Sequence, residues 1–320
     1  MIIIKRGNWN GVAANLNEAF YWYKKSAENG NYNGENALGN CYNWGKGVEQ
    51  NYTIAMDWYL KAAKKNHHYA QYSLGEMYEK GHGVKIDLET ALGWYQAAAQ
   101  NKNPNAADKV EKLKTPAEHY AEAIKGNAEQ QNYLGVCYHD GLGVEQNYKL
   151  AAEWYLQAIK QNNKHAYNNI GLLYKYGNGV PKDLAKACEY FKTSAKLGKI
   201  EAMVNYALCC YEGTGTEKNY TEALNWFHKA ADNNHSGACC YIGNCYDSGK
   251  GVEQDYKKSC EWYQKGININ GNSWCYYNLA TNYLNGNGVP QNRAKAIELY
   301  KASAEKGNES AKEKLSKLGA

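Results

Sequence analysis

A period of 36 residues constrains this chain more than any other feature. One aromatic position recurs at that spacing: Trp22, Trp58 and Trp94, then Trp154, Tyr190, Trp226 and Trp262, followed by Leu299 after 37 residues. A Gly-x-Gly follows the same period in seven complete copies: Gly45/Gly47, Gly81/Gly83, Gly141/Gly143, Gly177/Gly179, Gly213/Gly215, Gly249/Gly251 and Gly286/Gly288. Self-similarity at this length is typical of repeat arrays. The 320 residues are therefore one array rather than the two globular domains that the length alone suggests.

Each copy has the pattern of two helices. The first contains Leu-Gly-x-x-Tyr, as in Leu38-Gly39…Tyr42, which places these residues on one helical face. The Gly-x-Gly ends this helix, because glycine adopts the left-handed conformation that follows a helix C-terminus. The second helix contains Ala-x-x-Trp-Tyr-x-x-Ala-Ala and begins after a good N-cap residue: Asn51, Asp87, Asn147, Asp183, Asn219, Asp255 and Asn292. The pattern predicts an all-α fold of antiparallel helical hairpins.

Two segments depart from the pattern. The chain starts within a repeat, with its first helix missing, so residues 1–6 cover an apolar helix face or the chain is a piece of a longer array. Around residues 104–125 the Gly loop is missing, and a Lys-rich helix resembles the last helix of the chain. Thr115-Pro116 and Glu118 then have the spacing of a new helix start. We expect two segments of one continuous solenoid, residues 1–114 and 115–320, with a bend near residue 114.

These motifs resemble the Sel-1-like repeat family, which is related to the tetratricopeptide repeats, over almost the whole chain. The resemblance implies an α-solenoid of about eight hairpins wound into a right-handed superhelix. It also implies a non-enzymatic adaptor or scaffold for protein complexes. By the tetratricopeptide resemblance, the concave groove is lined from the first helix, at the positions two before and two, five and six after the motif leucine. At the centre these positions are Asn132, Val136, His139, Asn168, Leu172, Lys175, Tyr176, Val204, Leu208 and Tyr211.

The centre of this predicted groove is apolar, because Val136, Leu172 and Leu208 share one position of consecutive complete repeats. An exposed apolar strip marks a partner site, and asparagine amides can hold an extended peptide backbone. We therefore expect a peptide or protein segment to bind here. The alternative is that the three residues only pack against adjacent hairpins. Two other roles stay open: a structural spacer or regulatory fragment of a larger protein, which could associate through its uncapped N-terminal hairpin, and, less favoured, a hydrolase.

Composition and motifs argue against four other classes: a nucleic-acid-binding protein, a membrane-spanning protein, an enzyme and a metalloprotein. A net charge of +5 is too small to indicate a nucleic-acid partner, and no apolar run has the length of a membrane span. No nucleophile elbow or phosphate loop is present, so we expect no enzyme activity and no cofactor. His235, Cys239, Cys240 and Cys245 lack a Cys-x-x-Cys pair, so we expect no metal.

The ten cysteines are numerous enough for a disulfide framework. Packed helices lie about 8–10 Å apart, however, which is too far for a bridge between Cys209 and Cys245 of consecutive repeats. We therefore expect reduced, buried thiols and a cytoplasmic protein.

Overall fold

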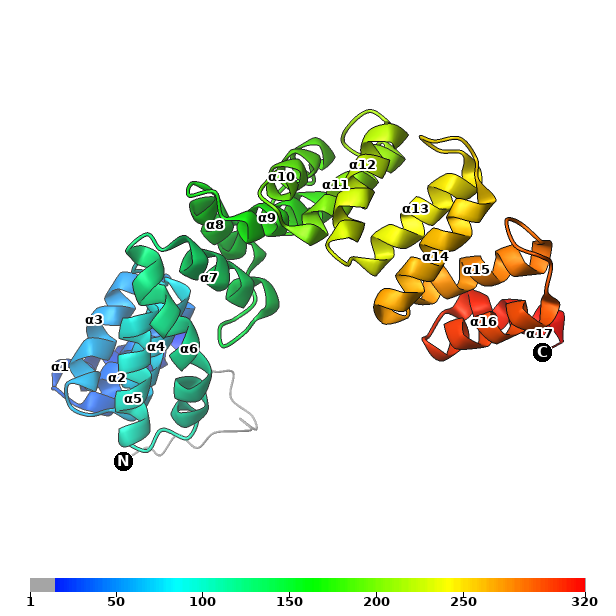
Figure 1. The fold of residues 1–320 in the computed structure, drawn as a ribbon. Coiled ribbons are helices and arrows are strands. Elements are labelled where there is room, and N and C mark those ends of the chain that lie inside the picture. Colours follow the sequence, from blue (N-terminus) through cyan, green and yellow to red (C-terminus); the bar gives the residue numbers. More distant parts are fainter. Residues whose placement is uncertain (1–14, 320) are drawn as a thin grey trace. The chain divides into compact units, whose positions relative to one another are not determined.

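The computed structural model describes residues 15–319, and every regular element in that range is an α-helix. The chain forms two compact units, residues 1–147 and 148–320, which Figure 1 shows in blue to green and in green to red. Within each unit, every helix packs mainly against the helices before and after it in the chain. The predicted all-α fold of sequential hairpins is confirmed.

The first unit contains seven described helices. They are α1 (Leu16–Glu28), α2 (Tyr32–Trp44), α3 (Tyr52–Ala63), α4 (His68–Lys80), α5 (Leu88–Gln100), α6 (Ala106–Ile124) and α7 (Ala128–Asp140). Helices α2/α3 and α4/α5 are complete hairpins. Helix α1 is the second helix of the predicted truncated repeat, and the rest of that repeat falls in residues 1–14, outside the described residues.

The second unit is built from hairpins of the same kind. Its described helices are α8 (Tyr148–Ile159), α9 (Lys164–Tyr176), α10 (Leu184–Lys196), α11 (Ile200–Glu212), α12 (Tyr220–Asp232), α13 (Ser236–Ser248), α14 (Tyr256–Asn270), α15 (Ser273–Asn285), α16 (Arg293–Glu305) and α17 (Glu309–Leu318). The complete hairpins are α9/α10, α11/α12, α13/α14 and α15/α16.

The predicted caps and loops hold the hairpins in register. The Asn51 side chain accepts a hydrogen bond from the Ile54 N–H, and five of the other predicted N-cap residues do the same for their helices: Asp87, Asp183, Asn219, Asp255 and Asn292. The loop glycines also set the distance between repeats. A Cβ on Gly215 would lie 1.9 Å from the carbonyl oxygen of Leu184, so this loop rests on the start of the preceding second helix. The other loops do the same, except the one at Gly143.

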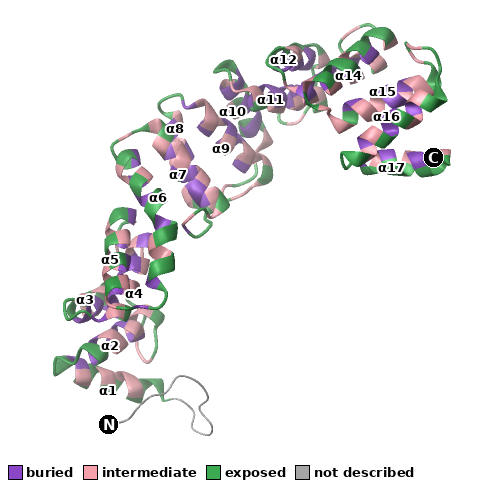
Figure 2. Ribbon diagram, turned by 60° about the horizontal axis from the view of Figure 1, so that its bottom comes forward, coloured by how far each residue is buried: buried purple, intermediate pink, exposed green. Residues whose placement is uncertain are grey.

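The core of each hairpin is a ring of the second helix placed over a glycine of the first. A Cβ on Gly39 would lie 2.6 Å from the Tyr59 ring, and one on Gly171 would lie 2.7 Å from the Phe191 ring. The predicted need for a small residue at this place is confirmed. The rings are almost fully buried in every complete hairpin: Tyr59, Tyr95, Phe191, Phe227, Tyr263 and Tyr300. Figure 2 shows the buried residues as inner faces along the helices.

The degenerate repeat differs from the prediction. A single helix, α6, runs through Thr115 and contains Pro116, so the predicted helix start at Thr115 is wrong. Burial accounts for this continuity, because Ala106, Leu113, Ala117 and Tyr120 form one buried helical face across the proline.

Pro116 is tolerated inside α6 although it cannot donate to the carbonyl of Lys112. The loop at Gly143 packs against that carbonyl instead. The second half of α6 therefore takes the role of a second helix, while a separate first helix and its loop are missing. The segment boundary and bend near residue 114 stay predictions.

The cysteines also correct an expectation. Cys240 of α13 and Cys275 of α15 form a disulfide, with Cα atoms 5.3 Å apart. The expectation of ten reduced thiols is wrong for this pair, because it used the distance between helix axes. Residues on the facing sides of neighbouring first helices approach more closely, and Gly266 of α14 leaves the space. The other eight cysteines are free and buried.

Candidate functional site

The predicted groove residues lie on first helices in both units. The second unit holds seven of them: Asn168, Leu172, Lys175 and Tyr176 on α9, and Val204, Leu208 and Tyr211 on α11. The first unit holds the other three, Asn132, Val136 and His139, on α7. On each helix these residues lie on consecutive turns. This follows from their positions, which are two before and two, five and six after the motif leucine.

The polar groove residues of the second unit are partly committed to internal contacts. Asn168 is buried and accepts a hydrogen bond from Asn205 Nδ2 at 2.9 Å. The Tyr211 hydroxyl accepts one from Lys250 Nζ, also at 2.9 Å. Tyr176 is the exception, because it is 62% exposed and its ring lies 5.6 Å from Lys175 Nζ. Tyr176 therefore offers the most accessible contact area on this face.

Leu172 and Leu208 are partly buried, and they pack against the core cluster that contains Phe191 and Phe227. In three other repeats the same position, two after the motif leucine, is polar and bonds the hydroxyl of a tyrosine. The Tyr59 hydroxyl donates to Asn40 Oδ1 at 2.7 Å, Tyr263 does the same to Asn244 at 2.7 Å, and Tyr300 bonds Thr281 at 2.8 Å.

In these five repeats the side chain at this position therefore matches the ring beneath it. A phenylalanine has no hydroxyl to satisfy, so an apolar neighbour costs nothing, whereas a tyrosine needs an acceptor. This explains part of the apolar strip by internal packing. The remaining exposed surface of Leu172 and Leu208 is what stays available to a partner.

The groove residues of α7 show a similar division. Asn132 and Val136 are half-buried. His139 is partly exposed, and its Nδ1 lies 2.5 Å from Asp140 Oδ1. The His139 carbonyl also accepts a hydrogen bond from Gln146 Nε2 at 2.7 Å, which ties the following loop back to the helix end.

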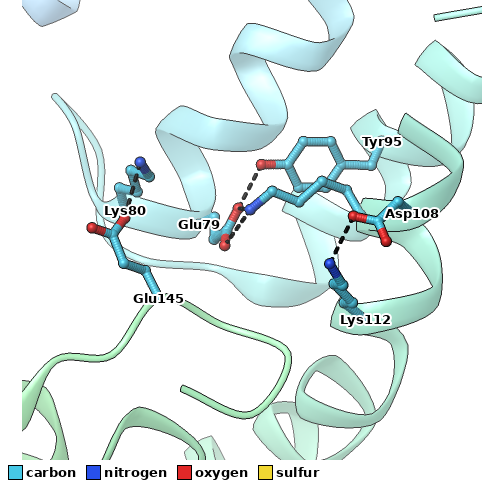
Figure 3. A network of polar contacts seen from close by, with 7 residues as sticks. Glu79, Lys80, Tyr95, Asp108, Lys112 and Glu145 are labelled. Atoms are coloured by element: carbon cyan, nitrogen blue, oxygen red, sulfur yellow. Dashed lines mark hydrogen bonds and ion pairs between the residues drawn. The ribbon is translucent and has the colours of Figure 1, made fainter. Parts of the chain in front are cut away.

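A polar network on α4 was not among the predicted site residues (Figure 3). Glu79 is only 4% exposed, and its carboxylate accepts hydrogen bonds from the Tyr95 hydroxyl at 2.5 Å and from Lys109 Nζ at 2.9 Å. A buried carboxylate needs such compensation. Burial, together with the Glu79 charge, holds the pKa of the Tyr95 hydroxyl far above its usual range. Lys80 pairs with Glu145 at 3.0 Å nearer the surface.

The same unit contains a small cavity of about 270 Å³ between α2 and α4. Its lining is polar or aromatic: Asn36, Asn40, Tyr69, Tyr72 and Ser73. Asn36 and Tyr72 lie two before their motif leucines, and Asn40 lies two after. These are the predicted groove positions, in repeats that the predicted site did not include. The signal was present in the sequence, because Asn36 and Asn40 occupy the same positions as Asn168 and Leu172.

Metal-ligating side chains are not clustered in the described part of the chain. Within residues 15–319, no group of three His, Cys, Asp or Glu side chains is arranged to hold a metal ion. His235, considered above with the neighbouring cysteines, caps α13 through a hydrogen bond from the Ala238 N–H to its Nδ1 at 3.1 Å. Burial raises the pKa of the Cys137 and Cys245 thiols to about 11, so both stay protonated at neutral pH. In the same range, no helix is long and apolar enough to span a bilayer.

Tandem hairpins with a 36-residue period define an α-helical repeat protein of the tetratricopeptide-like class. The chain belongs to the Sel1 repeat family. The Sel1 repeat matches eight segments: residues 5–31, 33–67, 68–103, 128–163, 164–199, 200–235, 236–269 and 275–308. Residues 104–127, which contain α6, match no repeat, in agreement with the missing first helix and loop there.

Solved structures of Sel1 repeat proteins are similar to this chain. A protective antigen from uropathogenic Escherichia coli strains, which displays the Sel1-like repeat fold, is 30% identical. The match covers 93% of this chain and 67% of that chain, with a TM-score of 0.61. A Sel1 repeat protein from Oxalobacter formigenes is 32% identical over 71% of this chain and 85% of that chain, with a TM-score of 0.56. None of the curated proteins compared with the chain matches it significantly.

Proposed function

We propose that this protein is a non-enzymatic scaffold that binds an extended segment of a protein partner along its first helices. Sel1 repeat proteins generally serve as protein-interaction scaffolds, which supports the class. The finer proposal concerns the surface: Leu172, Lys175 and Tyr176 on α9, with Leu208 and Tyr211 on α11, supply the contacts in the second unit.

The exposed Tyr176 ring carries this proposal. The framework rings of the repeats are buried beneath the first helices, but Tyr176 is 62% exposed, one helical turn beyond Leu172. Tyrosine gives a large contact area at low cost in conformational entropy, and it is enriched in interfaces. Next to it, the exposed part of Leu172 adds apolar area, each Å² of which contributes about 25 cal/mol when buried. A partner segment that covers both residues therefore gains free energy without disturbing the core.

The test uses a residue exchange that the repeats themselves tolerate. Leu172 and Leu208 contact the core, so charged replacements endanger folding, whereas asparagine occurs naturally at the same position as Asn40 and Asn244. The variant Leu172→Asn/Leu208→Asn/Tyr176→Ala is compared with Leu197→Asn. Leu197 is an exposed leucine at the end of α10, on a second helix.

Affinity capture with quantitative mass spectrometry, on variants shown to be folded by circular dichroism, measures the outcome. We expect the triple variant to lose the specific partner at least about 10-fold, while Leu197→Asn retains it. Equal recovery of every wild-type partner by the folded triple variant would overturn the proposal.

The compartment is a separate question. Eight free, buried thiols agree with the cytoplasmic location predicted from the sequence, whereas the Cys240–Cys275 bond agrees with an oxidising compartment. The cytoplasmic location stays a prediction. Alkylation of freshly extracted protein tests it, because Cys240 and Cys275 should be alkylated in a reducing compartment and protected in an oxidising one.

A further inference from the structure

The cavity between α2 and α4 is smaller than most small-molecule sites and can hold one side chain. Its volume of about 270 Å³ lies just below the range of roughly 300–1,000 Å³ that is typical of small-molecule sites. Residues of both first helices line it, Asn36 and Asn40 from α2 and Tyr69, Tyr72 and Ser73 from α4. A peptide that runs along the first helices can therefore place one side chain in this cavity.

Asn36, one of the residues that line the cavity, has an unused hydrogen-bond acceptor that is not exposed to the cavity. The Asn36 Oδ1 atom is buried and has no hydrogen-bond partner. By contrast, Asn40 Oδ1 accepts from the Tyr59 hydroxyl. A buried acceptor without a donor is unfavourable, and such groups are rare in folded proteins. If the Asn36 side chain turns its oxygen toward the cavity, a ligand that carries an N–H donor would satisfy it, and an apolar ligand would not.

A carboxylate without an ion pair among the described residues shares a helix face with one of the residues that line this cavity. Glu76 follows the lining residue Tyr72 by four residues on α4, which places their Cβ atoms about 5–6 Å apart on one face. Its negative charge acts on both Tyr59 and Tyr72. Within residues 15–319, Glu76 makes no hydrogen bond or ion pair, whereas nearby Glu79 is paired with Lys109.

The charges of Lys80 and Lys109 do not offset the burial of the Glu76 carboxyl group, whose pKa stays raised. Desolvation raises the pKa of its carboxyl group, and the charges of Glu79 and Glu145 act in the same direction, against Lys80 and Lys109. Both lysines form their short ion pairs elsewhere, Lys80 with Glu145 and Lys109 with Glu79. A positive charge brought to this place would stabilise the ionised form of Glu76.

The aromatic lining favours the same chemistry. Tyr69 and Tyr72 both line the cavity, and tyrosine rings attract cations over their faces. An anionic side chain would be repelled by Glu76, and an apolar one would leave Asn36 Oδ1 unsatisfied. A lysine or arginine side chain satisfies all three features, since it has an alkyl stem, N–H donors and a positive charge.

We propose that the cavity formed by Asn36, Asn40, Tyr69, Tyr72 and Ser73 binds one lysine or arginine side chain of the extended partner, with Glu76 as the countercharge. This rests on the proposed function, because it names a partner feature that the first helices of the first unit select. The first unit then recognises a charged side chain of the partner between α2 and α4.

The test uses short blocked peptides, Ac-Ala-Ala-X-Ala-Ala-NH2, with lysine, arginine, norleucine or glutamate at X. Nuclear magnetic resonance of the full chain follows the side-chain amide signals of Asn36 and Asn40. We expect the lysine and arginine peptides to shift both signals in a saturable way. The norleucine and glutamate peptides should bind at least about 10-fold more weakly.

Matched variants separate charge recognition from general binding. Glu76→Gln should raise the Kd for the lysine peptide at least about 10-fold and leave the norleucine peptide unchanged. Glu111→Gln, an exposed position on α6 of the same unit, should change neither. Asn36→Leu provides a second disruption of the site if Glu76→Gln alters folding.

Three results would overturn the inference: equal binding of lysine and norleucine peptides, no effect of Glu76→Gln on the lysine peptide, or no shift of Asn36 and Asn40 with any cationic peptide. If partner capture still depends on Leu172, Leu208 and Tyr176 in that case, the scaffold function stands and only the cation site is wrong.

Discussion

The repeats built around phenylalanine and those built around tyrosine solve one packing problem in two ways. In α9–α12 the buried rings are Phe191 and Phe227, and the first helices place Leu172 and Leu208 against them. In α2–α3 the ring is Tyr59, and its hydroxyl donates to Asn40. In the repeats with Leu172, Leu208, Asn40, Asn244 or Thr281 at this position, the side chain thus depends on whether the ring beneath it has a hydroxyl to satisfy.

A position that varies between repeats is therefore not always a binding residue, because its side chain can be matched to the core. In the sequence, Leu172 and Leu208 stand out as an apolar strip, which indicates a partner site. In the structure, part of their character is an internal match to Phe191 and Phe227. The positions whose character has no internal cause, such as the exposed ring of Tyr176, are better indicators of binding.

The largest expected effect concerns the disulfide, which ties together tyrosine-type repeats only. Cys240 and Cys275 close a loop with a sequence separation of 35 residues, and removing such a bond typically costs about 2–4 kcal/mol. We expect Cys240→Ala/Cys275→Ala to lower the free energy of unfolding of the repeats α13–α16 by this amount. Hydrogen exchange resolved by peptide should show the loss there, with little change in the phenylalanine-type helices α9–α12. A uniform loss along the second unit would contradict this.

Exchanging the residue pairs of the two types of repeat tests the comparison directly. Tyr59→Phe removes the donor to Asn40 Oδ1 and should cost about 1 kcal/mol, since the amide is left without its partner. Adding Asn40→Leu recreates the Phe191/Leu172 pair and should recover most of that loss. In the opposite direction, Phe191→Tyr should be better tolerated with Leu172→Asn than alone. Urea titrations of the four single and two double variants measure the coupling, and additive effects in both cycles would show that the positions are independent.

The smallest expected effect is on the pH dependence of stability, which differs between a first helix capped by histidine and one capped by asparagine. His67 caps α4 by accepting the Ala70 N–H at Nδ1, whereas α9 begins with Asn163 accepting from Ala166. Burial, with a contribution from His68, lowers the pKa of His67. The unfolded chain therefore binds a proton more readily, and stability falls as the pH drops below the unfolded value of about 6.5.

His67→Asn should reduce this acid sensitivity, because asparagine caps without titrating. Melting temperatures at neutral and mildly acidic pH measure it. Burial also lowers the pKa values of His82 and His228, so a residual slope is expected in the variant. An unchanged slope would show that His67 does not contribute.

Much of the fold could be predicted from the sequence because its determinants are local. Asn51 and its equivalents cap their helices, Gly39 and Gly171 accept the rings, and the loop glycines end the first helices, as their spacing indicates. The predicted helix start at Thr115 is wrong. The burial of Leu113, Ala117 and Tyr120 along a single face of α6 outweighs the local sequence pattern of a helix start.

The site was less predictable because it depends on contacts between repeats. The pairing of Cys240 with Cys275 requires the close approach of α13 and α15, which Gly266 allows and no spacing rule reveals. The polar cavity depends on Asn36 and Tyr72, at predicted positions but on neighbouring first helices. Whether such positions form a cavity or pack closely depends on side-chain volumes on both helices.

Site-specific photo-crosslinking tests most directly the central claim that the first helices bind the partner. A photoreactive phenylalanine analogue replaces Tyr176 on α9 in one protein and Lys192, exposed on α10, in another. We predict that the captured partner is crosslinked from position 176 and not from position 192, and that Leu172→Asn/Leu208→Asn abolishes the crosslink. Crosslinks of equal yield from both positions, or from position 192 alone, would contradict the account.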